Sequence, residues 1–356
     1  MSILTAEKLN KSFGDNHVLR DVSLSLEDGE FVSLLGVSGG GKTTLFNVLS
    51  GLYTPDSGKV TLGGKDITGK PGSISYMLQK DLLLPFKRVI DNVALPLVIK
   101  GMTKKEARAE AEKHFGVFGI DGTQMLYPYA LSGGMKQRAA LLRTYLASDG
   151  VVLLDEPFSD FNEETRLKLM EDVFKLQKRS KINFIYFTKK PEEALALADK
   201  MIVLEKGEVI DYDTPANVYD HPRTLPCARF IGEPPVNVFL GALKDDNGLK
   251  FVAESFECDF DEDLRDYFKD YIGTGKKLQL AIRAEDVHRG DMLKGKIEDK
   301  TESGDNKFVA FSVAGDSSAH YALSDGAENV GETVGFSLDL SFANFYDFET
   351  EKNILG

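Results

Sequence analysis

The chain has 356 residues, of which 42% are hydrophobic and 28% are charged. This length suffices for two domains with their own cores, and the composition is ordinary for a soluble globular protein. No apolar run is long enough to span a bilayer, and the N-terminus lacks the basic and apolar segments of a secretory signal. The two cysteines, Cys227 and Cys258, predict neither a disulfide framework nor a metal site.

The net charge of −13 falls almost entirely in residues 236–356. An acidic surface repels nucleic acid and anionic lipid, so we expect no nucleic-acid partner. Solvated charge that keeps this region soluble is the simpler interpretation of the acidic side chains.

The first predicted elements lead into a phosphate-binding loop. Residues 3–27 alternate in strand fashion around a turn at 13–16, and residues 30–35 predict a short buried strand. Residues 44–50 predict a helix that ends at Gly51. Between strand and helix lies the motif G-x-x-x-x-G-K-[ST], formed by Gly36, Val37, Ser38, Gly39, Gly40, Gly41, Lys42 and Thr43.

This motif predicts the binding of a nucleoside triphosphate. Its glycines allow successive backbone N–H groups to turn inward and cradle phosphate oxygens at the positive end of a helix. We expect Lys42 to reach the β- and γ-phosphates, Thr43 to hold Mg²⁺ through its hydroxyl, and Thr44 to line the same site. The alternative is an ordinary glycine-rich turn, which needs neither the lysine nor the threonine in this register.

A helical insert is predicted at about residues 82–146. Gln79 lies just after a short strand, and the compact apolar stretch 82–97 comes next. Residues 104–115 have strong helix propensity. Near the end of the insert, residues 131–138 read Leu-Ser-Gly-Gly-Met-Lys-Gln-Arg and run directly into a helical pattern.

Two buried parallel strands are predicted next. Residues 151–154 form an apolar run that ends in Asp155 and Glu156, and residues 182–187 form another, followed by a helix over 191–198. After a phosphate loop, such an acidic pair indicates nucleotide hydrolysis, with Asp155 holding Mg²⁺ and Glu156 polarising the attacking water. The alternative is an acidic strand end without a special function.

The composition changes around residues 222–235, which we take as the boundary between a domain at 1–235 and one at 236–356. Short strands with turns dominate the second domain, and a short helix is predicted near 264–271. This pattern predicts a small β-barrel or OB-like domain. Its expected strands lie at 248–253, 277–283, 308–313 and 333–338.

Residues 131–138 resemble the signature sequence of the ATP-binding cassette (ABC) ATPases, and the resemblance covers residues 3–235. It implies an α/β fold of the P-loop NTPase class, in which a mixed sheet is the core and a helical subdomain is attached. In this family Ser132, Gly133 and Gly134 would complete the nucleotide pocket of the opposite subunit, so that ATP is held between two cassettes. The alternative is a helix cap with two glycines and no ligand.

The resemblance also implies roles for residues outside the main motifs. Phe13 stands where an aromatic ring stacks on adenine, and Gln79 matches the glutamine that contacts Mg²⁺ and senses the γ-phosphate. The apolar stretch 82–97 corresponds to the groove that receives a short helix from a membrane-spanning partner. Plain core packing is the alternative for that stretch.

The two halves of the chain resemble importers of different cargo. Residues 282–285 and 345–355 are similar to the regulatory, TOBE-like domain of maltose, iron and polyamine importers. The cassette, with Leu84-Pro85 and Tyr127-Pro128, is more similar to the nitrate, sulfonate and thiamine-precursor importers. The transported solute therefore stays open.

Two positions depart from the family's pattern. Where the family has Thr-His-Asp the chain has Thr188, Lys189 and Lys190, and where a loop aspartate is usual it has Asn162. Lys189 still supplies positive charge, but an ammonium has no acceptor and cannot relay a hydrogen bond. Lys189 joins Glu156 and Gln79 as a candidate catalytic residue, and we expect ATP binding and dimer closure to survive while hydrolysis is slower.

The resulting prediction is the ATPase subunit of an ABC importer, which binds ATP and Mg²⁺, pairs with a second cassette and drives separate transmembrane permease subunits. An extracytoplasmic solute-binding protein would take part indirectly, and the chain would lie on the cytoplasmic face of the cell membrane through the permease. One alternative, motivated by Lys189 and Asn162, is a non-hydrolysing or impaired cassette that acts as a scaffold or asymmetric partner. Another is a soluble cassette ATPase of translation or DNA repair, which the acidic C-terminal region fits poorly.

Overall fold

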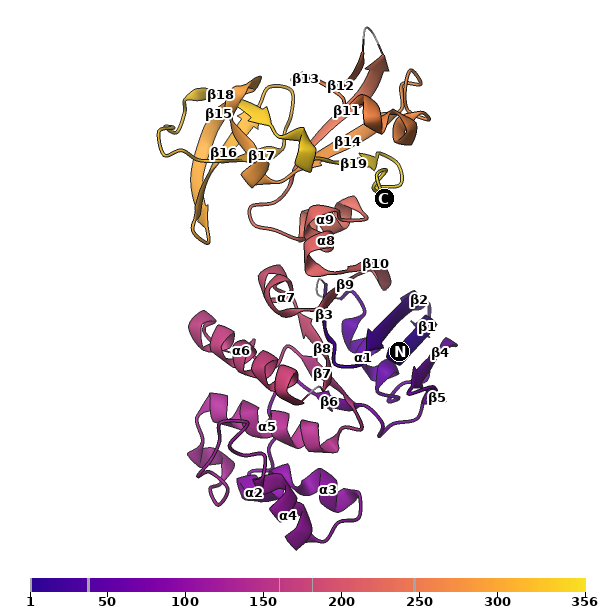
Figure 1. The fold of residues 1–356 in the computed structure, drawn as a ribbon, viewed down its shortest axis with the longest axis vertical. Helices are drawn as coiled ribbons and strands as arrows, with labels where there is room; N and C mark the ends of the chain where they lie inside the picture. The colour runs from indigo at the N-terminus through magenta and orange to yellow at the C-terminus, as the bar shows by residue number, and fades with distance from the viewer. Residues whose placement is uncertain (1, 37–38, 160, 181, 246–247) are drawn as a thin grey trace. The chain divides into compact units, whose positions relative to one another are not determined.

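The protein is described by a computed structural model that covers two compact units, shown as a ribbon in Figure 1. The units are Met1–Pro215 and Ala216–Gly356. Within them, the structure describes residues 2–36, 39–159, 161–180, 182–245 and 248–356.

The division between the units falls before residue 235, where the sequence placed a domain boundary. The helix α9 (Leu225–Phe230) belongs to the second unit, as does all but the first residue of α8 (Pro215–Asp220). Leu225 of α9 shares a small core with Tyr346, far along the chain, which explains why these helices go with the C-terminal residues.

A mixed sheet forms the centre of the first unit. Its strands are β3 (Phe31–Leu35), β6 (Ser75–Met77), β7 (Val151–Asp155), β8 (Asn183–Thr188), β9 (Lys200–Glu205) and β10 (Glu208–Asp213). The strand order is β10-β9-β3-β8-β7-β6, in which β10 and β9 pair antiparallel and the other neighbours pair parallel. β3 and β8 are buried along their whole length, as expected for strands covered on both faces.

A second, antiparallel sheet contains the N-terminal hairpin. Its strands are β1 (Ser2–Phe13), β2 (Asn16–Glu27), β4 (Ser57–Leu62) and β5 (Lys65–Asp66), in the order β2-β1-β4-β5. The helix α1 (Lys42–Leu49) follows the phosphate loop. Leu45 and Phe46 of α1 share one core with Leu24 of β2 and Leu34 of β3, so this helix is held between the two sheets.

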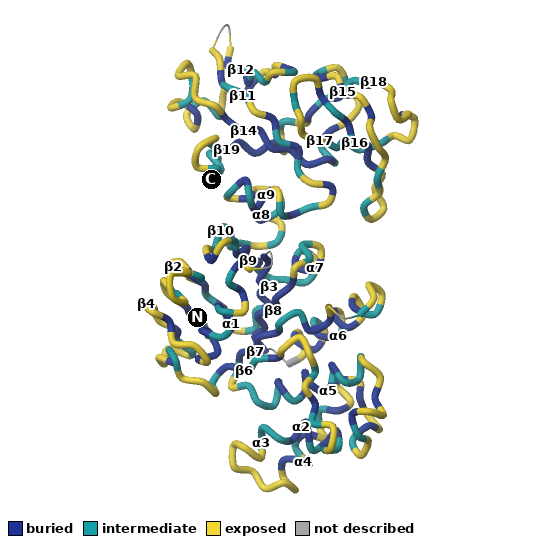
Figure 2. The backbone as a smooth tube through the Cα atoms, turned by 180° about the vertical axis from the view of Figure 1, so that it is seen from behind, coloured by how far each residue is buried: buried dark blue, intermediate teal, exposed yellow. Residues whose placement is uncertain are grey.

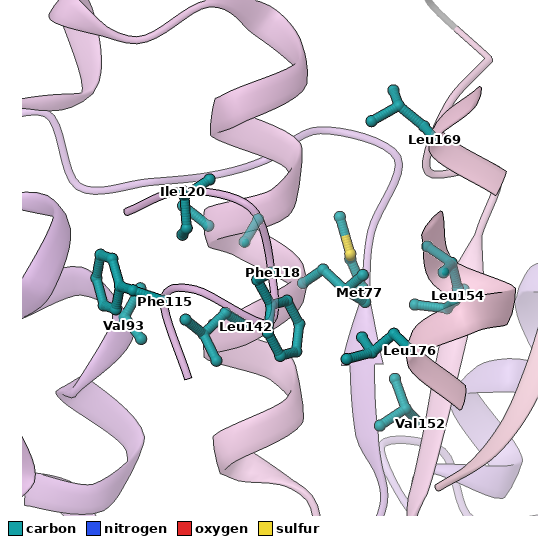
Figure 3. Packing of buried hydrophobic residues seen from close by; sticks show 14 of the residues in the cluster. Met77, Val93, Phe115, Phe118, Ile120, Leu142, Val152, Leu154, Leu169 and Leu176 are labelled. Atoms are coloured by element: carbon teal, nitrogen blue, oxygen red, sulfur yellow. The ribbon is translucent and has the colours of Figure 1, made fainter. Parts of the chain in front are cut away.

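The predicted helical insert packs on the central sheet through another apolar core. Figure 3 shows Phe115 beside Val93 and Leu142, with Met77 and Leu154 of the sheet in the same cluster. Besides α1, the described residues of the first unit contain the helices α2 (Val89–Val93), α3 (Leu95–Ile99), α4 (Lys104–Glu112), η1 (Pro128–Ala130), α5 (Gly133–Ala147), α6 (Glu163–Ser180) and α7 (Pro191–Leu197). Sheet and insert together confirm the predicted cassette fold.

Two antiparallel sheets form the second unit. The first contains β11 (Asn237–Asp245), β12 (Leu249–Ala253), β13 (Glu257–Asp259), β14 (Lys277–Ile282) and β19 (Asn344–Asp347). The second contains β15 (Val287–Ser303), β16 (Asn306–Val313), β17 (Ala319–Leu323) and β18 (Thr333–Leu338). Their orders are β13-β12-β11-β14-β19 and β17-β16-β15-β18.

One core joins the two sheets of the second unit. It includes Phe251 and Leu280 from one sheet and Phe311 and Phe336 from the other. Figure 2 shows the buried strands of this unit separated by exposed turns. The expected small barrel-like β domain is confirmed, whereas the helix expected near 264–271 is the 3-10 helix η2 (Glu262–Phe268).

Within the described residues of both units, no helix has the length and apolar character that a membrane crossing requires.

The core of the helical insert gives a test of the fold. Phe115 is fully buried, so Phe115→Ala should lower the free energy of unfolding of the first unit by about 3–5 kcal/mol. Phe86 is 74% exposed, and Phe86→Ala should change it by no more than about 0.5 kcal/mol. Urea denaturation of both variants measures the difference. Equal effects would contradict this packing.

Candidate functional site

Four predicted site segments leave the central sheet at the same end. The register pairs Leu35 of β3 with Thr188 of β8, and Asp155 of β7 with Phe187 of β8, while β6 ends beside β7. We call this end of the sheet the carboxyl edge. The phosphate loop, the acidic pair, Lys189 and the glutamine predicted to sense the γ-phosphate all follow these strands. The parallel pairing therefore gathers segments that are far apart in the sequence.

Glycines shape the phosphate loop. Gly39 and Gly41 have φ angles of 83° and 94°, in the left-handed region that favours glycine. Lys42 begins α1, and its ammonium donates a hydrogen bond of 2.9 Å to the carbonyl oxygen of Gly36. In the first turn of the helix, Thr43 is exposed and Thr44 is half-buried. Two predicted residues, Val37 and Ser38, lie outside the described residues.

Lys42 is buried, and other charged groups act on it. Burial, followed by the positive charge of Lys189, lowers the pKa of Lys42 to about 8, against the opposing effects of Glu156 and Asp155. The ammonium also lies 4.6 Å from the centre of the Phe187 ring. Two cations and two carboxylates are therefore within electrostatic reach of one another at the carboxyl edge.

Asp155 is held by a tyrosine that no motif singles out. The hydroxyl of Tyr76 on β6 donates a hydrogen bond of 2.7 Å to Oδ2 of Asp155. The Tyr76 ring packs edge to face against Phe46 of α1, with the ring centres 5.6 Å apart. Burial raises the pKa of Asp155, and the hydrogen bond from Tyr76 opposes that rise. The clue in the sequence is a polar side chain on a strand, but only the pairing of β6 with β7 brings it to Asp155.

Glu156 makes an ion pair with the residue that departs from the family's pattern. Nζ of Lys189 lies 2.8 Å from Oε1 of Glu156, whose side chain is only 15% exposed. The backbone of Glu156 has a φ of 43°, and its N–H donates a hydrogen bond of 3.1 Å to the carbonyl oxygen of Phe187. This conformation is uncommon for a residue with a side chain, so the neighbouring strand fixes where the carboxylate lies.

Gln79 connects the site to the loop after β7 and to the helical insert. Its side-chain amide donates a hydrogen bond of 3.0 Å to Oγ of Ser159, whose hydroxyl donates one of 3.0 Å to the carbonyl oxygen of Glu156. The side chain of Gln137 on α5 donates a hydrogen bond of 3.1 Å to the carbonyl oxygen of Gln79. Ser159 therefore links the side chain of Gln79 to the backbone of the acidic pair.

The signature residues lie at the start of α5. Oγ of Ser132 accepts a hydrogen bond of 3.3 Å from the backbone N–H of Met135 and caps the helix. A Cβ on Gly133 would lie 3.2 Å from the ring of Phe161, so a larger residue there would require that ring to shift by a few tenths of an ångström. Ser132 and Gly134 line a pocket with residues of α6, such as Glu164, rather than with Lys42.

Asn162 and Phe13 each make local contacts in the first unit. Oδ1 of Asn162 accepts a hydrogen bond of 3.0 Å from the N–H of Thr165 in the first turn of α6, a role that an amide oxygen fills without charge. Phe13 at the end of β1 is 47% exposed, contacts Tyr53 edge-on at 5.6 Å and has Nζ of Lys11 5.5 Å from its ring centre.

The chain is similar to known ATP-binding proteins of import systems. The ABC transporter family matches residues 19–159. The Fe(3+) ions import ATP-binding protein FbpC of Rhizobium etli is 39% identical over 233 residues, 65% of this chain and 66% of that protein. The spermidine/putrescine import ATP-binding protein PotA of Clostridium novyi is 31% identical over 315 residues, 88% of each chain. This chain belongs to the ABC transporter ATPase family.

The share of each ABC protein that this chain covers differs from one relative to the next. The chain spans just under two thirds of the length of the iron-import relatives from Rhizobium etli and Agrobacterium fabrum, at 66% and 65%. A solved dimer of an ATP-binding cassette in a post-hydrolysis state, bound to ADP and Pi, shares 26% identity with a TM-score of 0.52, covering 60% of this chain and 98% of that one. The ABC cassette of this chain is thus similar to one that forms dimers.

The phosphate loop of the ABC cassette gives a second test. A Cβ on Gly41 would lie 2.8 Å from the carbonyl oxygen of Val18, whereas a Cβ on Gly39 would meet no atom within 4 Å. Both substitutions to alanine carry the cost of a positive φ, so the contact should make Gly41→Ala the more destabilising by about 1–3 kcal/mol. Chemical denaturation compares the two variants, and a Gly39→Ala chain that is equally destabilised would contradict this loop geometry.

Proposed function

We propose that this chain is the ATP-binding and ATP-hydrolysing subunit of an ABC importer. It pairs with a second cassette, and ATP-driven closure of the pair powers solute uptake through a separate permease. The observation that supports this most strongly is the meeting of Lys42, Asp155 and Glu156 at the carboxyl edge, within reach of each other's charge. The import function named for the iron and polyamine relatives supports the direction of transport.

ATP binds with its phosphates on the loop between β3 and α1. Backbone N–H groups at the start of α1 would hold the phosphates, and Lys42, whose ammonium contacts the carbonyl oxygen of Gly36, would bind the β- and γ-phosphates. The phosphate charge favours the ammonium form of Lys42 over the neutral form. Adenine stacks on Phe13, whose exposed ring is available at the end of β1.

The residues near the loop fit a magnesium ion. Mg²⁺ prefers oxygen ligands, and Thr43 offers an exposed hydroxyl while Asp155 offers a carboxylate that Tyr76 orients. Gln79 would add an oxygen ligand through its side-chain amide. The ion would neutralise charge on the β- and γ-phosphates.

Glu156 acts as the general base in hydrolysis. It accepts a proton from water while the water oxygen bonds to the γ-phosphorus and the bond from that phosphorus to the bridging oxygen breaks, which releases ADP and phosphate. Lys42 stabilises negative charge that shifts toward the leaving group. Gln79 senses the γ-phosphate, and its link through Ser159 to the backbone of Glu156 couples that contact to the base.

A second cassette completes the site. The N-terminus of α5 carries Ser132 and two glycines whose bare backbone admits close approach of an anion. Ser132 and Gly133 are exposed, so a γ-phosphate bound to another cassette has access to them. The similarity to a solved cassette dimer supports this pairing.

An apolar groove of about 670 Å³ is the docking site for the permease. It is lined by residues of the insert such as Leu84 and Pro96, and two of its lining side chains, Leu82 and Ile99, are 54% and 77% exposed. Arg143 of α5 shapes its edge by donating a hydrogen bond of 2.9 Å to the carbonyl oxygen of Leu82. A short apolar helix of a permease subunit would cover this surface.

Docking in this groove would hold the chain on the cytoplasmic face of the cell membrane, as a peripheral subunit. An extracytoplasmic solute-binding protein would act through the permease and not on this chain. Of the two cargo types indicated by the sequence, the names of the iron and polyamine relatives favour the maltose, iron and polyamine kind over the nitrate kind.

The second candidate function is an impaired cassette that binds ATP and closes without efficient hydrolysis. The specific observation in its favour is the 2.8 Å ion pair that occupies Glu156. Phosphate release by the full chain with Mg²⁺ and ATP separates the two: turnover supports the importer motor, whereas ATP-dependent dimers that release no phosphate support the impaired cassette.

The role of Tyr76 can be tested by its effect on metal binding. Tyr76→Phe removes the hydrogen bond to Asp155, and loss of such an orienting contact typically weakens metal affinity by about 10–100-fold. Titration of Mg²⁺ into the ATP-bound chain measures this shift. Tyr212→Phe removes a tyrosine hydrogen bond to Ser25, and its magnesium affinity should equal that of the unmodified chain. The same loss in both variants would sink the proposed role.

The role of Ser132 can be tested without breaking its helix cap. Aspartate and asparagine both cap helices well, but only aspartate would repel a γ-phosphate. In a Glu156→Gln background with ATP, Ser132→Asp should remain monomeric while Ser132→Asn dimerises. Sedimentation velocity reports the masses, and a dimer of the aspartate variant as stable as that of the asparagine variant would contradict the shared pocket.

A further inference from the structure

We propose that Lys189 is a positioning residue that senses the γ-phosphate: its ammonium holds Glu156 in the nucleotide-free chain, and the γ-phosphate of ATP draws it away and frees Glu156 to accept a proton. We call this contact the Lys189–Glu156 latch. The inference rests on the proposed ATPase function and specifies how that site is regulated.

The latch is built into the strands and is not a chance surface pair. Lys189 directly follows Thr188, whose hydroxyl donates a hydrogen bond of 2.6 Å to the buried carboxylate of Glu193. Glu193 in turn makes a 2.6 Å ion pair with buried Arg166. On the other side, the N–H of Glu156 is tied to Phe187 on the same strand that leads to Lys189. Both partners are therefore positioned by β8 and its neighbours.

The burial of the two partners is unequal, and this favours exchange of the lysine. The Glu156 side chain is 15% exposed and held by its backbone, whereas the Lys189 side chain is 49% exposed. A long, exposed lysine has rotatable bonds that let its ammonium move between two anions. The carboxylate stays in place while the cation is the part that moves.

The phosphate end of the site lies within electrostatic reach of Lys189. Among the neighbouring charges, that of Lys189 has the largest effect on the pKa of Lys42. The ammonium of Lys42 contacts the carbonyl oxygen of Gly36 in the phosphate loop. Glu156 carries one negative charge and a γ-phosphate carries about two, part of which Mg²⁺ and Lys42 offset, so the two anions compete for the Lys189 ammonium. ADP ends one phosphate earlier and competes less.

The latch also gives a chemical role to Lys189, which stands where the family has histidine. While the ammonium lies against Oε1 of Glu156, it fills space and a lone pair that an attacking water molecule would otherwise use. Moving the ammonium to the γ-phosphate places a positive charge on the group that reacts and leaves the carboxylate to take the proton. In this way one lysine would tie activation of the base to the presence of ATP.

Nucleotide binding by the full chain tests the latch. Equilibrium dialysis with Mg²⁺ measures the affinities for a non-hydrolysable ATP analogue and for ADP. Lys189→Met should weaken binding of the analogue by about tenfold or more while ADP binding stays nearly the same, and Lys189→Arg should keep the preference. Equal weakening of both nucleotides, or an arginine variant as weak as the methionine variant, would overturn the latch.

Competition between the Glu156 carboxylate and the γ-phosphate for the Lys189 ammonium gives a second readout. Glu156→Gln should strengthen binding of the analogue more in the native background than in the Lys189→Met background, because only the former has an ammonium to release. The same gain in both backgrounds would overturn the latch alone. A native chain that binds neither nucleotide would overturn the proposed function together with it.

Discussion

The hydrogen-bonded register of β3, β8, β7 and β6 is the constraint on which the rest of the site depends. Parallel strands end at the same edge, so a loop that begins at Gly36, an acidic pair at 155–156 and a lysine at 189 become neighbours without being close in sequence. β3, β7 and β8 are largely apolar and buried, and apolar cores of the first unit pack on both faces of the sheet. The chemistry is thus carried by a rigid layer, while the charged groups sit where its strands stop.

The charges at this edge are balanced without a nucleotide. Lys42 and Lys189 oppose Asp155 and Glu156, and Lys42 bears the cost of burial in its lowered pKa. Buried or half-buried charges are costly unless they are paired, which explains why the site is closed on itself by a lysine–glutamate contact and a tyrosine–aspartate hydrogen bond. A triphosphate with its metal brings new charge, so binding must redistribute these partners, and the exposed lysine is the one able to move.

The sequence predicted the parts of the site that are local and failed to predict those that depend on strand order. The phosphate loop, the strand ending in Asp155 and the helix start at Ser132 were predicted because each is a short motif with its own geometry. Tyr76 was missed because its contact needs β6 to lie beside β7, and no spacing reveals that. Lys189 was noticed as a departure, but its partner emerged only from the pairing of β7 with β8. In the second unit, β15 was missed because many charged residues occupy its exposed positions and hide the apolar residues between them.

The central claim is that the carboxyl edge is a site for Mg²⁺ and ATP, and Lys42 tests it most directly. Isothermal titration of the full chain with ATP and Mg²⁺ should give one nucleotide per chain. Lys42→Met, which keeps the buried stem and removes the ammonium, should weaken that binding by about tenfold or more because a charge-assisted contact is lost. A native chain that binds no ATP, or a Lys42→Met chain that binds it equally well, would contradict the account.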